Sequence, residues 1–261
     1  MLRAPLLLGA LAALIIACGS PLRMDGAHVQ EQYGRLVVDD IVLEFSREVP
    51  VQGELSADAI SQGLTLGAHT GDIELVGGPA SKFEFVVTLQ TEIEGDGVVE
   101  LKDGMLRARS LEGGKCVING MRGRVPQGIN LDLLAGSGRV ILSRFQGVQT
   151  LNVESGVGAV QLEDVKAETL TLRSGTGNVQ LVSVKGNEAN VDLGVGSLLT
   201  QGCELAELRA RSSTGAFVLR ESRVHHGSFH SGTGNLQLVD SHVGNLERSL
   251  GTGEVIDGSL D

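Results

Sequence analysis

The sequence predicts an all-β fold, a parallel β-solenoid with about 19 residues per coil. A glycine pair with one residue between recurs along the second half of the chain, and its second glycine falls at Gly138, Gly158, Gly177, Gly196, Gly215, Gly234 and Gly253. The first interval is 20 residues and the other five are 19, a period typical of stacked repeats that bury one another's apolar faces. Apolar and polar residues alternate after each glycine, as in strands with one buried face. Glycine, at 37 of 261 residues, is also too frequent for helices.

Each repeat is expected to be one coil of two or three short strands with glycines at the corners, since glycine takes the positive φ that a tight corner requires. Two columns of inward side chains follow the glycine: Val140, Val160, Val179, Leu198, Phe217, Leu236 and Val255, then Leu142, Leu162, Leu181, Thr200, Leu219 and Leu238. A third column is Phe145, Val165, Val184 and Cys203. A second strand carries the inward pairs Leu170 and Leu172, Ala189 and Val191, and Leu208 and Ala210.

The first half of the chain is less regular. Residues 35–60 are expected to form strands that start or cap the stack, and residues 64–75 contain one more strand–glycine–strand unit, out of register with the later array. Residues 83–108 suggest longer strands, in wider coils or in an inserted hairpin. No linker is long enough to divide the chain, so we expect a single β-helix domain over 35–261, with irregular coils or a cap at 35–134 and regular coils at 135–261.

The N-terminus predicts export and a lipid anchor. Residues 1–17 have a short basic start at Arg3 and an apolar run of signal-peptide length, too short to span a bilayer. The run ends in Ile15, Ile16 and Ala17 before Cys18, which looks like a bacterial lipobox. That resemblance implies cleavage before Cys18 and acylation of Cys18, with residues 18–34 as a lipidated tether. Several acyl chains anchor firmly; Gly19 favours the outer membrane in a host with two membranes. An ordinary secretory signal is the alternative.

Charge and cysteine content limit the partners. The chain has 21 basic and 32 acidic residues, a formal net charge of −11, and loss of Arg3 with residues 1–17 leaves −12. This balance argues against nucleic acid and against polybasic docking on anionic lipid. An exported compartment permits a disulfide between Cys116 and Cys203. Cys203, however, falls in an inward column, where cysteine behaves as a small hydrophobic residue.

The chain resembles a large bacterial family of β-strand-repeat proteins of unknown function, described as adhesin-like. The resemblance covers roughly residues 35–261 and is carried by the unit at 64–73, the segment at 125–133 and the serial Ser-Gly-Thr-Gly-Asn-Val-Gln-Leu coils. It implies a right-handed, single-stranded β-helix, and it carries over no catalytic residues.

Several ligand motifs were weighed against structural explanations. The glycine pairs open strands, whereas a dinucleotide-binding loop opens a helix. The position after the second glycine lacks the carboxylate ladder that calcium requires; there we expect Asn178 and Asn235 to satisfy corner backbone groups. The histidines could hold zinc or copper, but in register the basic neighbours Arg211 and Arg223 oppose a cation. The histidines in question are His225, His226, His230 and His242. We therefore expect no metal and no cofactor.

An enzymatic β-helix, like the pectate lyases, needs clustered acids with a basic residue on one outer face. The nearest candidates scatter over three coils and form no column: Glu163, Asp164, Arg220, Glu221 and Arg223. The chain also has no Trp and one Tyr, where sugar platforms usually need exposed aromatic rings. We therefore expect no enzyme and no catalytic residue, and a polysaccharide-active enzyme is the least favoured alternative.

The sequence thus favours a non-enzymatic, lipid-anchored cell-envelope protein with a structural or adhesin-like surface for a protein or glycan partner. An envelope-stress or signalling accessory protein is the alternative. One outer column is less polar than expected, and it offers either a partner site or a surface that another segment covers. It consists of Ile141, Gln161, Gln180, Leu199, Val218, Gln237 and Ile256.

Overall fold

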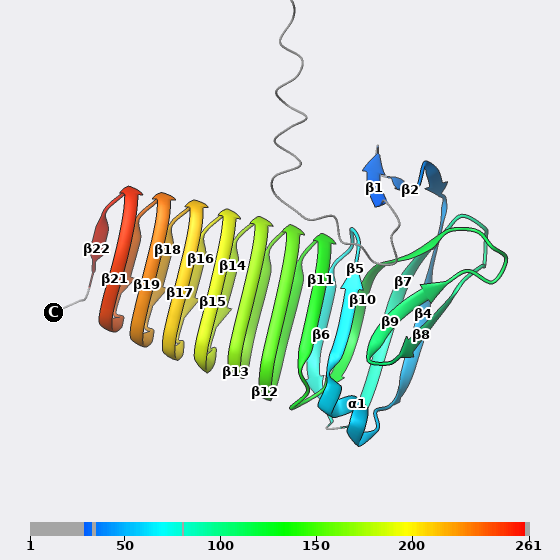
Figure 1. Ribbon diagram of the computed structural model, residues 1–261, viewed down its shortest axis with the longest axis horizontal. Helices are drawn as coiled ribbons and strands as arrows, with labels where there is room; N and C mark the ends of the chain where they lie inside the picture. The colour runs from blue at the N-terminus through cyan, green and yellow to red at the C-terminus, as the bar shows by residue number, and fades with distance from the viewer. Residues whose placement is uncertain (1–28, 33–34, 80, 259–261) are drawn as a thin grey trace, which may run out of the picture.

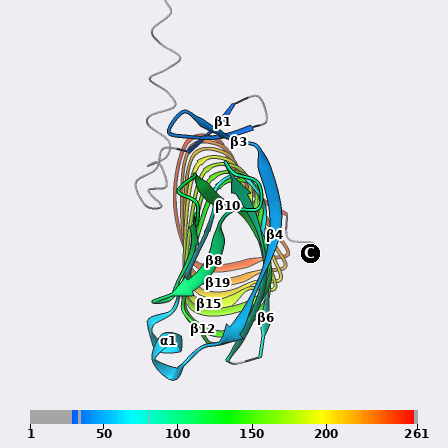
Figure 2. The same cartoon turned by 90° about the vertical axis from the view of Figure 1, so that its right-hand side faces the viewer.

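The computed structural model describes residues 29–32, 35–79 and 81–258, and these form a β-solenoid capped at its N-terminal end (Figure 1). Cys18 and the signal segment lie outside the described residues. Seen along the stack, the coils superimpose as nested outlines (Figure 2). Two sheet faces run along the solenoid, a short-strand face after each glycine corner and a long-strand face opposite. The regular coils comprise β11 (Leu131–Ser137), β12 (Val140–Val157), β13 (Val160–Thr176), β14 (Val179–Val182), β15 (Lys185–Val195), β16 (Leu198–Gln201), β17 (Glu204–Thr214), β18 (Phe217–Arg220), β19 (Arg223–Thr233), β20 (Leu236–Val239), β21 (His242–Thr252) and β22 (Val255–Asp257).

The predicted register and core are confirmed. Parallel pairing places Val160 beside Val179, Val179 beside Leu198, and so on through the array. The inward columns are fully buried from Val140 to Leu236, and one apolar cluster runs from Leu64 to Leu238. The first interval of 20 residues is explained by a bulge in β12, where the register shifts between Phe145 and Val148 against β13.

Two kinds of corner separate the faces, and only one is made of glycine. At the predicted corner Gly158, Gly177, Gly196, Gly215 and Gly234 have φ between 139° and 154°. A Cβ atom on any of them would overlap the carbonyl oxygen of the glycine one coil before. The other corner is left-handed but is mostly not glycine, and its φ values lie between 47° and 62°. Its residues are Arg144, Asp164, Ser183, Gly202, Glu221 and Asp240.

Side chains after the glycine corner tie successive coils together, as predicted. Asn178 Oδ1 accepts a hydrogen bond of 2.9 Å from the amide of Ser197, and Asn235 accepts one of 2.9 Å from Glu254. Asp72 takes the same role in the coil before that of Arg139, because its Oδ1 accepts from the amide of Arg139 at 2.8 Å. Burial opposes ionisation of Asp72, but the hydrogen bonds from Arg139 prevail and lower the pKa of that carboxyl.

The N-terminal region forms the cap and supplies one complete coil. β5 (Leu64–Ala68) and β6 (Ile73–Gly78) pair in parallel with β11 and β12, so Leu64 lies beside Leu131 and Ile73 beside Val140. The unit at 64–75 is therefore in spatial register with the array, contrary to expectation, and the interruption is an insertion. The inserted residues form β7 (Lys82–Thr91), an antiparallel hairpin of β8 (Val98–Lys102) and β9 (Met105–Arg109), and β10 (Cys116–Pro126).

Four strands and one helix complete this end. β4 (Phe45–Glu54) pairs antiparallel with β7. A second, antiparallel sheet contains β1 (Val29–Gln32), β2 (Arg35–Val38) and β3 (Ile41–Leu43). β1 lies within the range expected to be tether, so strand pairing begins earlier than the sequence suggested. The helix α1 (Ala57–Gln62) was not predicted, although Ser56 caps its N-terminus and Gly63 ends it.

The C-terminal end carries charges where the other coils carry core residues. Arg248 stacks on the buried Phe229, and Asp257 stacks on Leu238. Charged side chains at inward positions of an edge strand discourage pairing with another chain. We therefore expect the charges of the last described coil to oppose end-to-end joining of two solenoids.

Candidate functional site

A groove on the long-strand face encloses about 860 Å³. It runs along the solenoid axis from Ala135 to Ser249 and is lined by every coil between them. We call it the axial groove. The groove lies beside the glycine corner, where the chain loses its outward side chains. Its length suits an elongated partner better than a compact small molecule.

The first glycine of each pair forms the floor of this groove. Gly156, Gly175, Gly194 and Gly232 line it, and Ser213 replaces glycine in one coil. A Cβ atom at Gly156 or Gly194 would press against a carbonyl oxygen of the preceding coil. The same glycines that allow the coils to stack closely therefore leave a smooth channel open to a partner.

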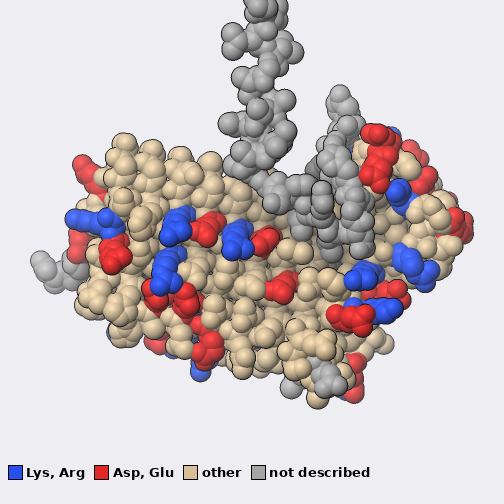
Figure 3. Space-filling model, viewed as in Figure 1, with Lys and Arg blue, Asp and Glu red and all other residues tan. Residues whose placement is uncertain are grey.

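Charged side chains of alternating sign form one wall. In register they are Glu154, Arg173, Asp192 and Arg211, one from each coil, and His230 occupies the same position on the next coil. Figure 3 shows basic and acidic side chains alternating in a row across the coils, below a band without charge. Coils stack about 4.8 Å apart, so charges of one sign recur about every 10 Å.

Only part of this wall is paired internally. The side chain of Arg173 forms an ion pair with Glu154 at 2.8 Å. The side chains of Asp192 and Arg211 have neither a hydrogen bond nor an ion pair within the described part of the chain. The hydroxyls of Ser155 and Ser174 point inward, are buried and have no partner among the described residues. The equivalent hydroxyls of Ser212 and Ser231 donate to backbone carbonyls at 3.2 Å. The unused hydrogen-bonding capacity that faces the groove is therefore that of Asp192 and Arg211.

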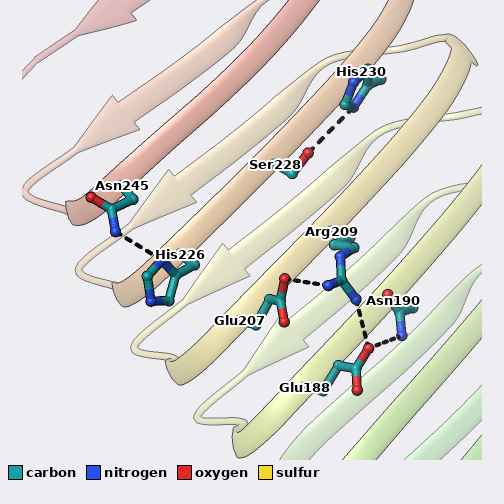
Figure 4. A network of polar contacts seen from close by, with 8 residues as sticks. All are labelled: Glu188, Asn190, Glu207, Arg209, His226, Ser228, His230 and Asn245. Atoms are coloured by element: carbon teal, nitrogen blue, oxygen red, sulfur yellow. Dashed lines mark hydrogen bonds and ion pairs between the residues drawn. The ribbon is translucent and has the colours of Figure 1, made fainter.

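A second polar network lies lower on the same face (Figure 4). Arg209 bridges Glu188 at 2.7 Å and Glu207 at 2.6 Å, and Asn245 contacts the ring of His226 at 2.9 Å. The Arg209 contacts link β15 with β17, and the contact of Asn245 with His226 links β19 with β21. Because Arg209 is satisfied by two carboxylates, this network stabilises the stack and leaves little free charge for a ligand.

The structure places the other predicted residues as follows. His242 lies beside Arg223, and His230 lies between Arg211 and Ser249, as predicted. In the described part of the chain no three His, Cys, Asp or Glu side chains gather as metal ligands would. Asp164 and Glu221 occupy left-handed corners of different coils. Glu163 lies beside Val182 of the next coil. The acids considered for catalysis are therefore not gathered at one place. Cys116 and Cys203 are both free thiols.

Cys203 is buried, as its column predicted, and its place in a polar cluster was not foreseen. Its amide donates to Ser222 Oγ at 3.2 Å, and that hydroxyl lies 3.1 Å from Thr200 Oγ1. Burial raises the pKa of the Cys203 thiol. The cluster satisfies polar side chains inside the core and reaches no cavity that a ligand could enter.

The apolar outer column on the short-strand face is half-buried from Ile141 to Gln237, and only Ile256 at the open end is exposed, at 44%. Its members stack on one another in register, as Leu199 does on Val218. Stacking of this kind accounts for their burial.

A β-solenoid whose coils line an axial groove defines a repeat scaffold. The chain belongs to the Toastrack DUF4097 family, whose model matches residues 118–255. In the described residues no helix has the length and hydropathy of a membrane span, and α1 has only six residues.

Two solved structures share the fold. One is a "putative adhesin" from Bacteroides fragilis, with 16% identity and a TM-score of 0.55 over 81% of this chain and 97% of its own. The other is a "putative adhesin" from Parabacteroides merdae, with 10% identity and a TM-score of 0.50 over 82% and 97%. Neither is described as an enzyme. A comparison with curated proteins found no match.

Proposed function

We propose that this protein is a non-enzymatic cell-envelope scaffold, lipid-anchored through Cys18, that binds an elongated protein or glycan partner in the axial groove. The observation that carries the proposal is the groove itself, a continuous channel with a glycine floor and unpaired charges at Asp192 and Arg211. The adhesin names of the two structural neighbours agree with a binding role. A charge repeat of about 10 Å suits a linear polymer that offers matching groups at regular intervals.

The groove is tested by reversing its basic charges. Arg173→Glu with Arg211→Glu should reduce recovery of the partner in a crosslinking pull-down from envelopes by at least about tenfold, since two charge-assisted contacts are lost. Arg220→Glu on the short-strand face is the matched control and should leave recovery unchanged. Protease or glycosidase treatment of the captured material distinguishes a protein from a glycan. Equal recovery by all three proteins would place the partner elsewhere.

The anchor is tested separately. Cys18→Ser removes the only thiol at the expected cleavage site, so the protein should move from the detergent phase to the aqueous phase on detergent partitioning. The folded domain should be unchanged, as measured by its circular dichroism spectrum. A Cys18→Ser protein that still partitions into detergent would contradict the lipid anchor and leave the groove unaffected.

A further inference from the structure

A second cavity lies at the capped end, beyond the N-terminal end of the axial groove, where its residue Leu134 is in register with Glu154 of the groove. It encloses about 300 Å³ between β9, the start of β10, and single residues of β2, β5 and β11. We call it the cap pocket. β9 meets β5 at one bridge only, Thr65 with Met105. β5 and β9 therefore pair only at Thr65 and Met105, and the remaining length of β9 borders the cap pocket.

Part of the cap pocket is apolar. Leu106, Val117 and Ile118 are at most 7% exposed, and Met105 and Leu134 extend the apolar lining toward the surface. A volume of about 300 Å³ is at the lower end for pockets that hold small molecules. The cap pocket is therefore suited to a short apolar chain, and it is too small for a folded partner or a long polymer segment.

The charged part of the lining is entirely basic. Arg107, Arg109 and Lys115 line the cap pocket, and none of the described residues that line it is acidic. This contrasts with a chain whose net charge is −11. The cap pocket is therefore a positively charged site on a negatively charged protein, and such a site attracts anionic ligands.

These cations are available to a ligand. The guanidinium of Arg107 contacts only Met105 Sδ, at 3.1 Å, and has no carboxylate partner in the described part of the chain. Lys115 pairs with Asp39 at 2.9 Å and Arg109 with Glu100 at 3.9 Å. Both pairs are exposed, and exposed pairs contribute little, so an incoming anion can displace the carboxylates.

Two further side chains in the cap pocket are uncharged at neutral pH. Burial lowers the pKa of His69, and burial raises the pKa of the Cys116 thiol. They add neither a negative charge nor a further positive one. The charges that line the cap pocket itself are therefore its three cations, while the carboxylate of Asp96 lies behind the lining, where it accepts a hydrogen bond from Ser110 and further raises the pKa of Cys116.

We propose that the cap pocket binds a free single-chain amphiphile with an anionic headgroup, of the fatty-acid class. The headgroup lies against Arg107, with Arg109 and Lys115 beside it, and the acyl chain lies on Leu106, Val117 and Ile118. A purely polar anion leaves the apolar lining unused, and a neutral chain leaves the cations unused. The cap pocket shares no lining residue with the axial groove, so either proposal can fail without the other.

Cys116 provides a direct measurement of occupancy. The full chain carrying Cys18→Ser retains two thiols, Cys116 and Cys203, and only Cys116 is reachable because Cys203 is 1% exposed. Decanoate below its micelle concentration should slow alkylation of Cys116 by a maleimide at least about fivefold at saturation, through a shielded and less ionised thiol. Acetate and decyltrimethylammonium at equal concentration should not.

Variants test the assignment of the headgroup. Arg107→Glu should raise the half-protecting decanoate concentration at least about tenfold, and Arg220→Glu, far from the cap pocket, should leave it unchanged. Calorimetric titration of the Cys116→Ser variant with decanoate should still show binding. Four results would each overturn the proposal: no protection by decanoate, equal protection by the cationic amphiphile, an unaltered response of Arg107→Glu, or protection only by anionic vesicles.

Discussion

Replacing Gly177 by alanine is expected to destabilise the solenoid by about 3 kcal/mol or more. Gly177 has a φ of 149°, a conformation that side-chain-bearing residues rarely adopt. Its Cβ atom would also overlap the carbonyl oxygen of Gly158 in the preceding coil. Relief requires the two coils to move apart, and that movement weakens the ladder between β13 and β14. Because repeats are stabilised by their neighbours, the loss should spread beyond one coil.

The other corner of the same coil supplies a matched control. Ser183 has a φ of 54°, so Ser183→Gly removes local strain while it adds freedom to the unfolded chain. The two effects oppose each other, and the change in stability should stay within about 1 kcal/mol. Urea midpoints of both variants, followed by circular dichroism, provide the comparison. A Gly177→Ala midpoint equal to that of wild type would show that the stacked corner tolerates a side chain.

These two corners show what the sequence could and could not predict. The glycine corner recurs with one residue type, because a carbonyl oxygen of the neighbouring coil excludes every Cβ atom there. At the left-handed corner Arg144, Ser183 and Glu221 are all accommodated. The backbone there costs only a modest amount in a non-glycine residue. Because no single residue type occupies the left-handed corner, a search for a recurring residue type finds the glycine corners and misses the left-handed ones.

The cap was harder to predict than the array, because its partners are far apart in sequence. Ile73 pairs with Val140 across an insertion that contains β7, β8, β9 and β10. Local alternation shows that such segments are strands, but it does not show which strand lies beside which. Regular spacing along the sequence identifies the neighbouring strand only where every coil has the same length.

The axial groove could have been found from the sequence. Glu154, Arg173, Asp192, Arg211 and His230 recur at 19-residue spacing, as the core columns do. The first glycine of each pair forms the floor of the groove, whereas the second forms the corner. The cap pocket could not have been found in this way. Arg107 and Cys116 are brought together only by the insertion.

A charge at Leu181 should be the most damaging single change on the short-strand face. Leu181 is fully buried and lies in register between Leu162 and Thr200. Leu181→Asp removes the buried side chain and places a carboxylate where no described residue offers a cation. The two costs together should reach at least about 5 kcal/mol. That is comparable with the whole stability of many domains.

A substitution at the neighbouring residue Gln180 is the control, because it places the same charge on the same strand but outside the core. Gln180 lies on the same strand, half-buried and pointing outward, so Gln180→Asp should cost no more than about 1 kcal/mol. Limited proteolysis with mass mapping should locate new cleavage in Leu181→Asp at the coils around β14, with β7 and β10 in the cap cut later. A solenoid whose coils depend on their neighbours separates first where the contact is lost. If Leu181→Asp resisted urea and protease like wild type, the inward column at this coil would be assigned to the wrong face.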